Sequence, residues 1–128
     1  MRMAIDTNRY RDFCVGVPEA VERFQTADRI LMPFTVLAEL RAGFACGTLS
    51  RRNENVLSRF LNRPRVACLF ADEQTTFHYS RIFSQLRGQG TPIPTNDIWL
   101  AALVEQHNVL LYSRDRHFDH VPQLARLA

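Results

Sequence analysis

Short apolar runs alternate with longer stretches of helical spacing along this chain. The runs predict four strands and a short closing strand, at Arg2–Ile5, Arg29–Met32, Val66–Phe70, Val109–Tyr112 and Leu124–Leu127. Val109–Tyr112 is apolar throughout, which is typical of a strand buried on both faces.

The stretches between these runs predict helices. Tyr10–Ala27 is helical in two pieces, broken at Gly16 and Pro18. Further helices are expected from Thr35 to about Gly47, over Arg51–Leu61, from Asp72 to about Leu86, and from Thr95 through a continuously apolar segment, with Thr35, Asp72 and Thr95 as N-caps. The buried side of the helix from Asp72 is expected to be formed by Phe77, Ile82, Phe83 and Leu86.

This alternation predicts an α/β fold, a three-layer α/β/α domain with a mainly parallel central sheet that occupies residues 1–128 as one domain. In such sheets ligands bind beyond the carboxyl ends of the strands, where the strand order reverses. Side chains that directly follow a strand are therefore candidates for a site.

Four acids have such positions. Asp6 and Asp115 closely follow strands, and Glu39 and Asp97 lie near the starts of apolar helices. Each alone also suits a turn, a cap or a solvated helix position. Gathered in one crevice, they would repel one another, and a hard cation such as Mg²⁺ or Mn²⁺ relieves that repulsion. Such an ion with arginines nearby indicates hydrolysis of phosphodiesters.

Other chemistries lack their motifs in this sequence. It contains neither a GxxxxGK[ST] loop nor a GxSxG elbow, and it has no lysine for a receiver-like acidic pocket. A dehalogenase-type phosphatase needs an acid at position 8, where the chain has asparagine. His117 and His120 come without the HExxH or cysteine pairs of zinc sites.

The charge balance is mildly basic, with a net charge of +3, and all 16 basic residues are arginine. Arginine offers a planar fork of donors that suits phosphate. A basic balance alone permits a polyanionic partner but does not identify one.

A cytoplasmic location is expected. No apolar run approaches the roughly 20 residues that span a bilayer, and the first one stops at Asp6. Three widely spaced cysteines, Cys14, Cys46 and Cys68, fit small buried thiols in a reducing compartment.

Four motifs, in order, resemble those of PIN domains. They are Ile5-Asp6-Thr7-Asn8, Thr35 to Gly43, Thr95 to Ala102, and Tyr112-Ser113-Arg114-Asp115-Arg116-His117-Phe118. With its size, the whole chain resembles the VapC-type ribonuclease toxins of type II toxin–antitoxin pairs.

The resemblance implies a Mg²⁺- or Mn²⁺-dependent endoribonuclease that cleaves tRNA, rRNA or mRNA. The candidates for contacts with that RNA are Arg9, Arg11, Arg87, Arg114 and Arg116, and Tyr10 or Trp99 is available for stacking on bases. It implies Asp6, Glu39, Asp97 and Asp115 as the catalytic and metal-binding acids, with Asp6 and Asp97 first for metal contact. Thr7, Asn8 and Ser113 are supporting candidates, and Asp119 is either a fifth acid or a turn residue. A homodimer inhibited by the C-terminal segment of a cognate antitoxin is also implied.

Two other functions remain open on the sequence alone. One is a housekeeping PIN-domain nuclease for RNA processing, and the other is a non-catalytic module that binds RNA or protein and whose acids are caps.

Overall fold

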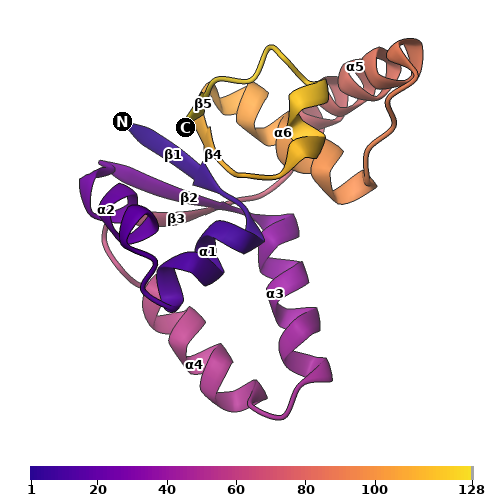
Figure 1. Ribbon diagram of the computed structural model, residues 1–128. Helices are drawn as coiled ribbons and strands as arrows, with labels where there is room; N and C mark the ends of the chain where they lie inside the picture. Colours follow the sequence, from indigo (N-terminus) through magenta and orange to yellow (C-terminus); the bar gives the residue numbers. More distant parts are fainter. Residues whose placement is uncertain (128) are drawn as a thin grey trace.

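The computed structural model describes residues 1–127, and their strands form one parallel sheet (Figure 1). The sheet has the order β3-β2-β1-β4-β5, with β1 at Arg2–Ile5, β2 at Arg29–Pro33, β3 at Val66–Leu69, β4 at Leu110–Tyr112 and β5 at Arg126–Leu127. Every strand pair within it is parallel. The predicted α/β fold with a parallel sheet is confirmed.

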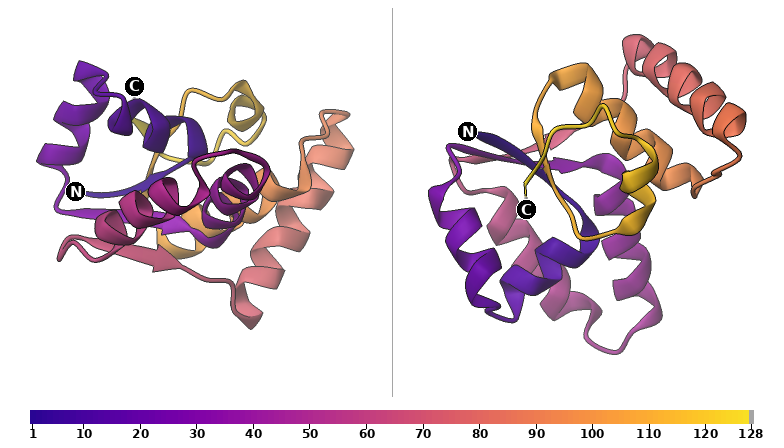
Figure 2. Two further views of the ribbon diagram at one scale, coloured as in Figure 1. Left: turned by 90° about the horizontal axis from the view of Figure 1, so that it is seen from below. Right: turned by 45° about the horizontal axis from the view of Figure 1, so that its top comes forward.

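Helices cover both faces of the sheet (Figures 1 and 2). On one face lie α1 (Thr7–Cys14), α2 (Pro18–Thr26), α3 (Phe34–Cys46) and α4 (Ser50–Leu61). On the other lie α5 (Glu73–Gln89), α6 (Thr95–His107) and the short 3₁₀ helix η1 (Arg116–His120). Right-handed crossovers explain why the helices divide between the two faces. The chain crosses the sheet in one direction from β1 through β2 to β3, and it then crosses back in the opposite direction to β4 and β5.

The strand order reverses between β1 and β4, which pair through Met3–Leu110 to Ile5–Tyr112. Both strands are buried, and α6 carries a fully apolar block from Leu100 to Val104 over them. The carboxyl ends of β1 and β4 therefore open side by side at the place where such sheets bind ligands.

The structure confirms one predicted helix start and corrects three. Asp72 caps α5 as predicted, in a reciprocal pair of bonds with Thr75. Thr35 and Thr95 are not caps, because the cap positions are taken by Pro33, two residues before Thr35, and by Pro94, one residue before Thr95. α1 also begins earlier than Tyr10, because Asp6 accepts a hydrogen bond from the Arg9 amide and caps it.

The longest helix, α5, stands away from the sheet and packs mainly on α6 (Figure 2). Ile82 and Leu86 are buried as predicted, but Phe77 and Phe83 are 54% and 46% exposed. A helix with one neighbouring helix buries only a narrow stripe, so the two rings outside that stripe face solvent. The helix also continues to Gln89, beyond its predicted end.

The cysteines do not have the burial expected of them. Cys14 and Cys46 are exposed because they are the last residues of α1 and α3, and Cys68 is half-buried. All three are free thiols. Over residues 1–127, no helix combines the length and the apolar character needed to cross a membrane.

Candidate metal-dependent active site

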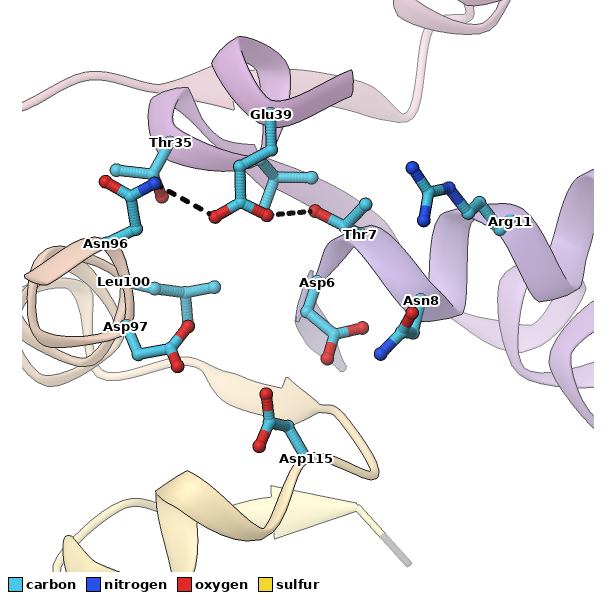
Figure 3. Close-up of a pocket in the computed structure, with 11 residues that line it drawn as sticks. Asp6, Thr7, Asn8, Arg11, Thr35, Glu39, Asn96, Asp97, Leu100 and Asp115 are labelled. Atoms are coloured by element: carbon cyan, nitrogen blue, oxygen red, sulfur yellow. Dashed lines mark hydrogen bonds between the residues drawn. The ribbon is translucent and has the colours of Figure 1, made fainter. Parts of the chain in front are cut away.

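A polar cavity of about 180 Å³ opens at the carboxyl ends of β1 and β4 (Figure 3). All four predicted acids line it, with Asp6 following β1, Asp115 following β4, and Glu39 and Asp97 coming from α3 and α6. Their carboxylates point toward one another across the cavity. The structure thus brings together side chains that are up to 109 residues apart in sequence.

Asp6 is the most enclosed of the four, at 6% exposure. Its Oδ2 accepts a 2.5 Å hydrogen bond from the Ser113 hydroxyl, and its Oδ1 accepts the Arg9 amide at 2.8 Å. Ser113 Oγ in turn accepts the Asp115 amide at 3.0 Å. Ser113 therefore ties the end of β1 to the end of β4 and fixes the direction of the Asp6 carboxylate.

Glu39 is held from two sides. Thr7 donates its hydroxyl to Oε2 at 2.8 Å, and Asn96 donates its amide to Oε1 at 3.1 Å (Figure 3). Both donors are neutral, so they orient the carboxylate without cancelling its charge. Thr7 lies next to Asp6 and Asn96 next to Asp97, so Glu39 bridges the two helix starts that carry the other acids.

Asp97 and Asp115 meet around the ring of His117. Nδ1 of His117 lies 2.8 Å from Asp97 Oδ2 and 3.2 Å from Asp115 Oδ1. Asp115 also caps η1, because its Oδ1 accepts the His117 amide at 2.9 Å. The ligand atoms of these three side chains lie within 4.8 Å of one another, which one metal ion is able to span.

Burial and repulsion between neighbouring carboxylates raise the pKa of two of the acids. Burial raises the pKa of Asp6 above its usual value, against the lowering effect of the Ser113 hydrogen bond. Burial likewise raises the pKa of Asp97, and repulsion from Asp115 and Glu39 adds to it. Without a cation, the ionised site therefore carries an electrostatic cost.

One polar atom of the cavity has no protein partner. Thr35 is 4% exposed and lines the cavity, and within residues 1–127 nothing hydrogen-bonds to its Oγ1. A buried hydroxyl without a partner is rare in folded proteins. Converging carboxylates with an unpaired hydroxyl form an oxygen-rich donor set, and that set fits a hydrated Mg²⁺ or Mn²⁺ ion.

The five candidate arginines occupy different environments. Arg11 lines the acidic cavity, as does Asn8 at the same rim (Figure 3). Arg9 is not presented to a ligand, because it is buried over the Tyr112 ring and paired with Asp12. Arg114 donates two hydrogen bonds to that same Asp12. Arg87 lines a separate apolar pocket, and Arg116 lies exposed on η1.

The two candidate stacking rings are both engaged in the fold. Tyr10 is buried edge-on against Phe60. Trp99 is half-buried and packs on Phe34 and Tyr79. Neither ring is free to act as a base platform.

A distant residue holds the loop that follows β4. Arg126 on β5 donates to the carbonyl oxygens of Ser113 and Asp115, at 3.0 and 3.3 Å. It also donates to Asp119 at 2.6 Å, which directs Asp119 away from the cavity and into this clamp. Arg126 therefore fixes the backbone that presents Asp115 and His117.

Sequence reasoning missed His117, Asn96, Thr35 and Arg126 as parts of this site. His117 and Asn96 adjoin predicted acids, and the position of His117 just beyond β4 was a usable signal. Thr35 was interpreted as a cap. Nothing local marks Arg126, because its role depends on how β5 pairs with β4.

Known proteins share the sequence pattern and the fold of this chain. Residues 15–124 match the sequence model of the PIN domain. The Haemophilus influenzae protein named Ribonuclease VapC1 is 32% identical over 109 residues, which cover 84% of this chain and 80% of that protein. Two solved structures each give a TM-score of 0.88 over 99% of this chain and 97% of theirs. They are VapBC-1 from nontypeable Haemophilus influenzae, at 26% identity, and the DNA-bound VapBC from Salmonella typhimurium, at 25%. The chain belongs to the PIN-domain family, and within it to the VapC group.

Proposed function

We propose that this protein is a metal-dependent endoribonuclease that acts as the toxin of a toxin–antitoxin pair. The observation that carries the proposal is the cavity in which Asp6, Glu39, Asp97 and Asp115 converge. The name of the VapC1 relative supports ribonuclease activity, and the resemblance to VapC proteins supports the toxin role.

Asp6, Asp97 and Asp115 are the residues that would hold Mg²⁺ or Mn²⁺, with Glu39 facing the same space. When bound, such an ion supplies an activated water and neutralises charge on the phosphate. Ser113 keeps the Asp6 carboxylate aimed into the cavity, while Thr7 and Asn96 keep Glu39 in place to orient a water. Arg11 at the rim is placed to contact an RNA phosphate.

The partner that inhibits the site is proposed to be a cognate antitoxin. An apolar groove lies between α1, α3 and α4, lined by Tyr10, Leu40, Phe44 and Val56. Arg11 lines both this groove and the acidic cavity, so the two are neighbours. A C-terminal antitoxin segment in the groove would therefore reach and cover the acids. The names of the VapBC structures support a partner of this kind.

A homodimer is also proposed, with the outer side of α5 as its interface. Phe83 is a large apolar side chain exposed there, and it lines a pocket together with Pro92 and Ile93. Neighbouring exposed apolar groups of this kind mark association surfaces. Sedimentation of the purified protein is expected to show a dimer, and a monomer at micromolar concentration would contradict this part of the proposal.

The function is tested by incubating total cellular RNA with the antitoxin-free protein. Discrete fragments are expected with Mg²⁺ or Mn²⁺, no cleavage with EDTA, and recovery when the metal is returned in excess. Sequencing of the fragment ends would identify the RNA and the cleaved bond. If the folded, metal-bound protein leaves all RNA intact, the non-catalytic binding module becomes the better explanation.

A further inference from the structure

The ring of His117 has an unusual position for a surface histidine. Its Nδ1, rather than its outer Nε2, points between the carboxylates of Asp97 and Asp115. The side chain is 45% exposed, so water reaches the rest of the ring. The backbone holds this arrangement as well, because the His117 amide is bound by the Asp115 carboxylate.

The separations around Nδ1 match those of ligands on one metal ion. Two ligands at right angles, each about 2.1 Å from an octahedral ion, lie about 3.0 Å apart. The distances from Nδ1 to Asp97 Oδ2 and to Asp115 Oδ1 are 2.8 and 3.2 Å. Both distances are close to that value, so Nδ1 and each of these two oxygens would fit as neighbouring ligands of one ion.

We propose that His117 is a nitrogen ligand of the bound ion and that it makes this site select Mn²⁺ over Mg²⁺. Imidazole nitrogen suits first-row transition ions, whereas Mg²⁺ favours oxygen donors throughout. Asp97, Asp115 and His117 would hold the ion together with Asp6, and waters would supply its remaining ligands. This proposal rests on the metal-dependent function proposed above.

A different role for His117 is a simple hydrogen bond from a protonated Nδ1 to Asp97, with no contact to the ion. That role predicts oxygen-only coordination and no dependence of metal preference on residue 117. Coordination predicts a direct magnetic coupling between Mn²⁺ and a nitrogen nucleus. The two roles therefore differ in a property that does not involve cleavage.

The experiment compares the wild-type protein with His117→Asn, whose amide oxygen reaches nearly as far as Nδ1 but replaces nitrogen with oxygen. His120→Asn is the matched control, because it removes an exposed imidazole from the same helix η1. Each protein is loaded with Mn²⁺ and measured by pulsed electron paramagnetic resonance. Calorimetric titrations with Mn²⁺ and with Mg²⁺ give the ratio of the two dissociation constants.

Nitrogen-14 coupling is expected in the wild type and in His120→Asn and is expected to be lost in His117→Asn. The preference for Mn²⁺ over Mg²⁺ should fall about tenfold or more in His117→Asn, in line with the cost of altering a metal site. Mn²⁺ that binds the wild type without nitrogen coupling would overturn the role of His117 and leave the nuclease proposal intact. A wild-type protein that binds neither ion would overturn the metal-dependent function itself.

Discussion

Replacing Asp97 with asparagine is expected to abolish RNA cleavage and, without metal, to stabilise the folded protein. Asp97 faces Asp6, Glu39 and Asp115 across the cavity, so its charge is needed only when a cation is present. Removal of one group that stabilises transition-state charge typically costs 10² to 10³ in rate, and a lost metal ligand should cost about that or more. Fragment yield from RNA at saturating Mg²⁺ or Mn²⁺ measures the loss.

The stabilisation of the metal-free protein by Asp97→Asn is expected to depend on pH. The folded protein raises the pKa of Asp97 above its usual value of 3.8, so the folded state binds the proton more tightly than the unfolded state does. Ionisation of Asp97 therefore destabilises the metal-free fold progressively as pH rises above 3.8 and through the raised pKa. The advantage of Asp97→Asn over the wild type should grow over that range and level off above it, as followed by thermal unfolding in EDTA.

Glu22→Gln is the matched control, since it removes an exposed carboxylate from α2, far from the cavity. It should change neither cleavage nor the pH dependence of unfolding. If Asp97→Asn lowered the stability of the metal-free protein at neutral pH, Asp97 would be a helix-start residue of structural value. That result would support the binding-module hypothesis.

A second large effect is expected from Arg126→Ala, although Arg126 does not line the cavity. Its guanidinium bonds the carbonyl oxygens of Ser113 and Asp115 and the carboxylate of Asp119. Without it, the segment that carries Asp115 and His117 loses its anchor. Outer residues that orient metal ligands typically contribute 10- to 100-fold in affinity or activity. We expect Mn²⁺ affinity and cleavage to fall together by about that factor.

The clamp needs the shape of arginine as well as its charge. Arg126→Lys keeps the charge but cannot serve three acceptors from one planar fork, so it should recover only part of the activity. Arg2→Ala is the control, because Arg2 bonds a single carbonyl oxygen, that of His107, at the opposite end of the sheet. Unchanged Mn²⁺ affinity in a folded Arg126→Ala protein would show that the β4 loop holds its shape without the clamp.

The sequence predicted the sheet and the acids well, for a common reason. Parallel strands that are buried on both faces leave apolar runs, and the polar residues that end those runs lie at one edge of the sheet. Asp6 and Asp115 could be placed by that rule alone, whereas Glu39 and Asp97 were singled out because they lie near the starts of apolar helices.

The errors come from effects beyond local spacing. Phe77 and Phe83 follow a helical apolar pattern, but α5 has too narrow a contact to bury them. The position of Arg9 beside Asp6 suggested a free cation, yet the turn of α1 directs it over Tyr112. Thr35 and Thr95 are residue types that often cap helices, but Pro33 and Pro94 take the cap positions, two residues before Thr35 and one residue before Thr95.

The Asp6–Ser113 bond joins positions 107 residues apart, and this separation has a consequence for synthesis on the ribosome. A nascent chain that has emerged only through α5 already contains Asp6 and Glu39 but lacks α6 and β4. The two acids therefore have no carboxylates opposite them in the cavity. Residues 97 to 126 then supply Asp97, Ser113, Asp115 and the arginine clamp together. A partly synthesised chain therefore lacks two of the four acids, and under the proposed function we expect it to leave RNA intact.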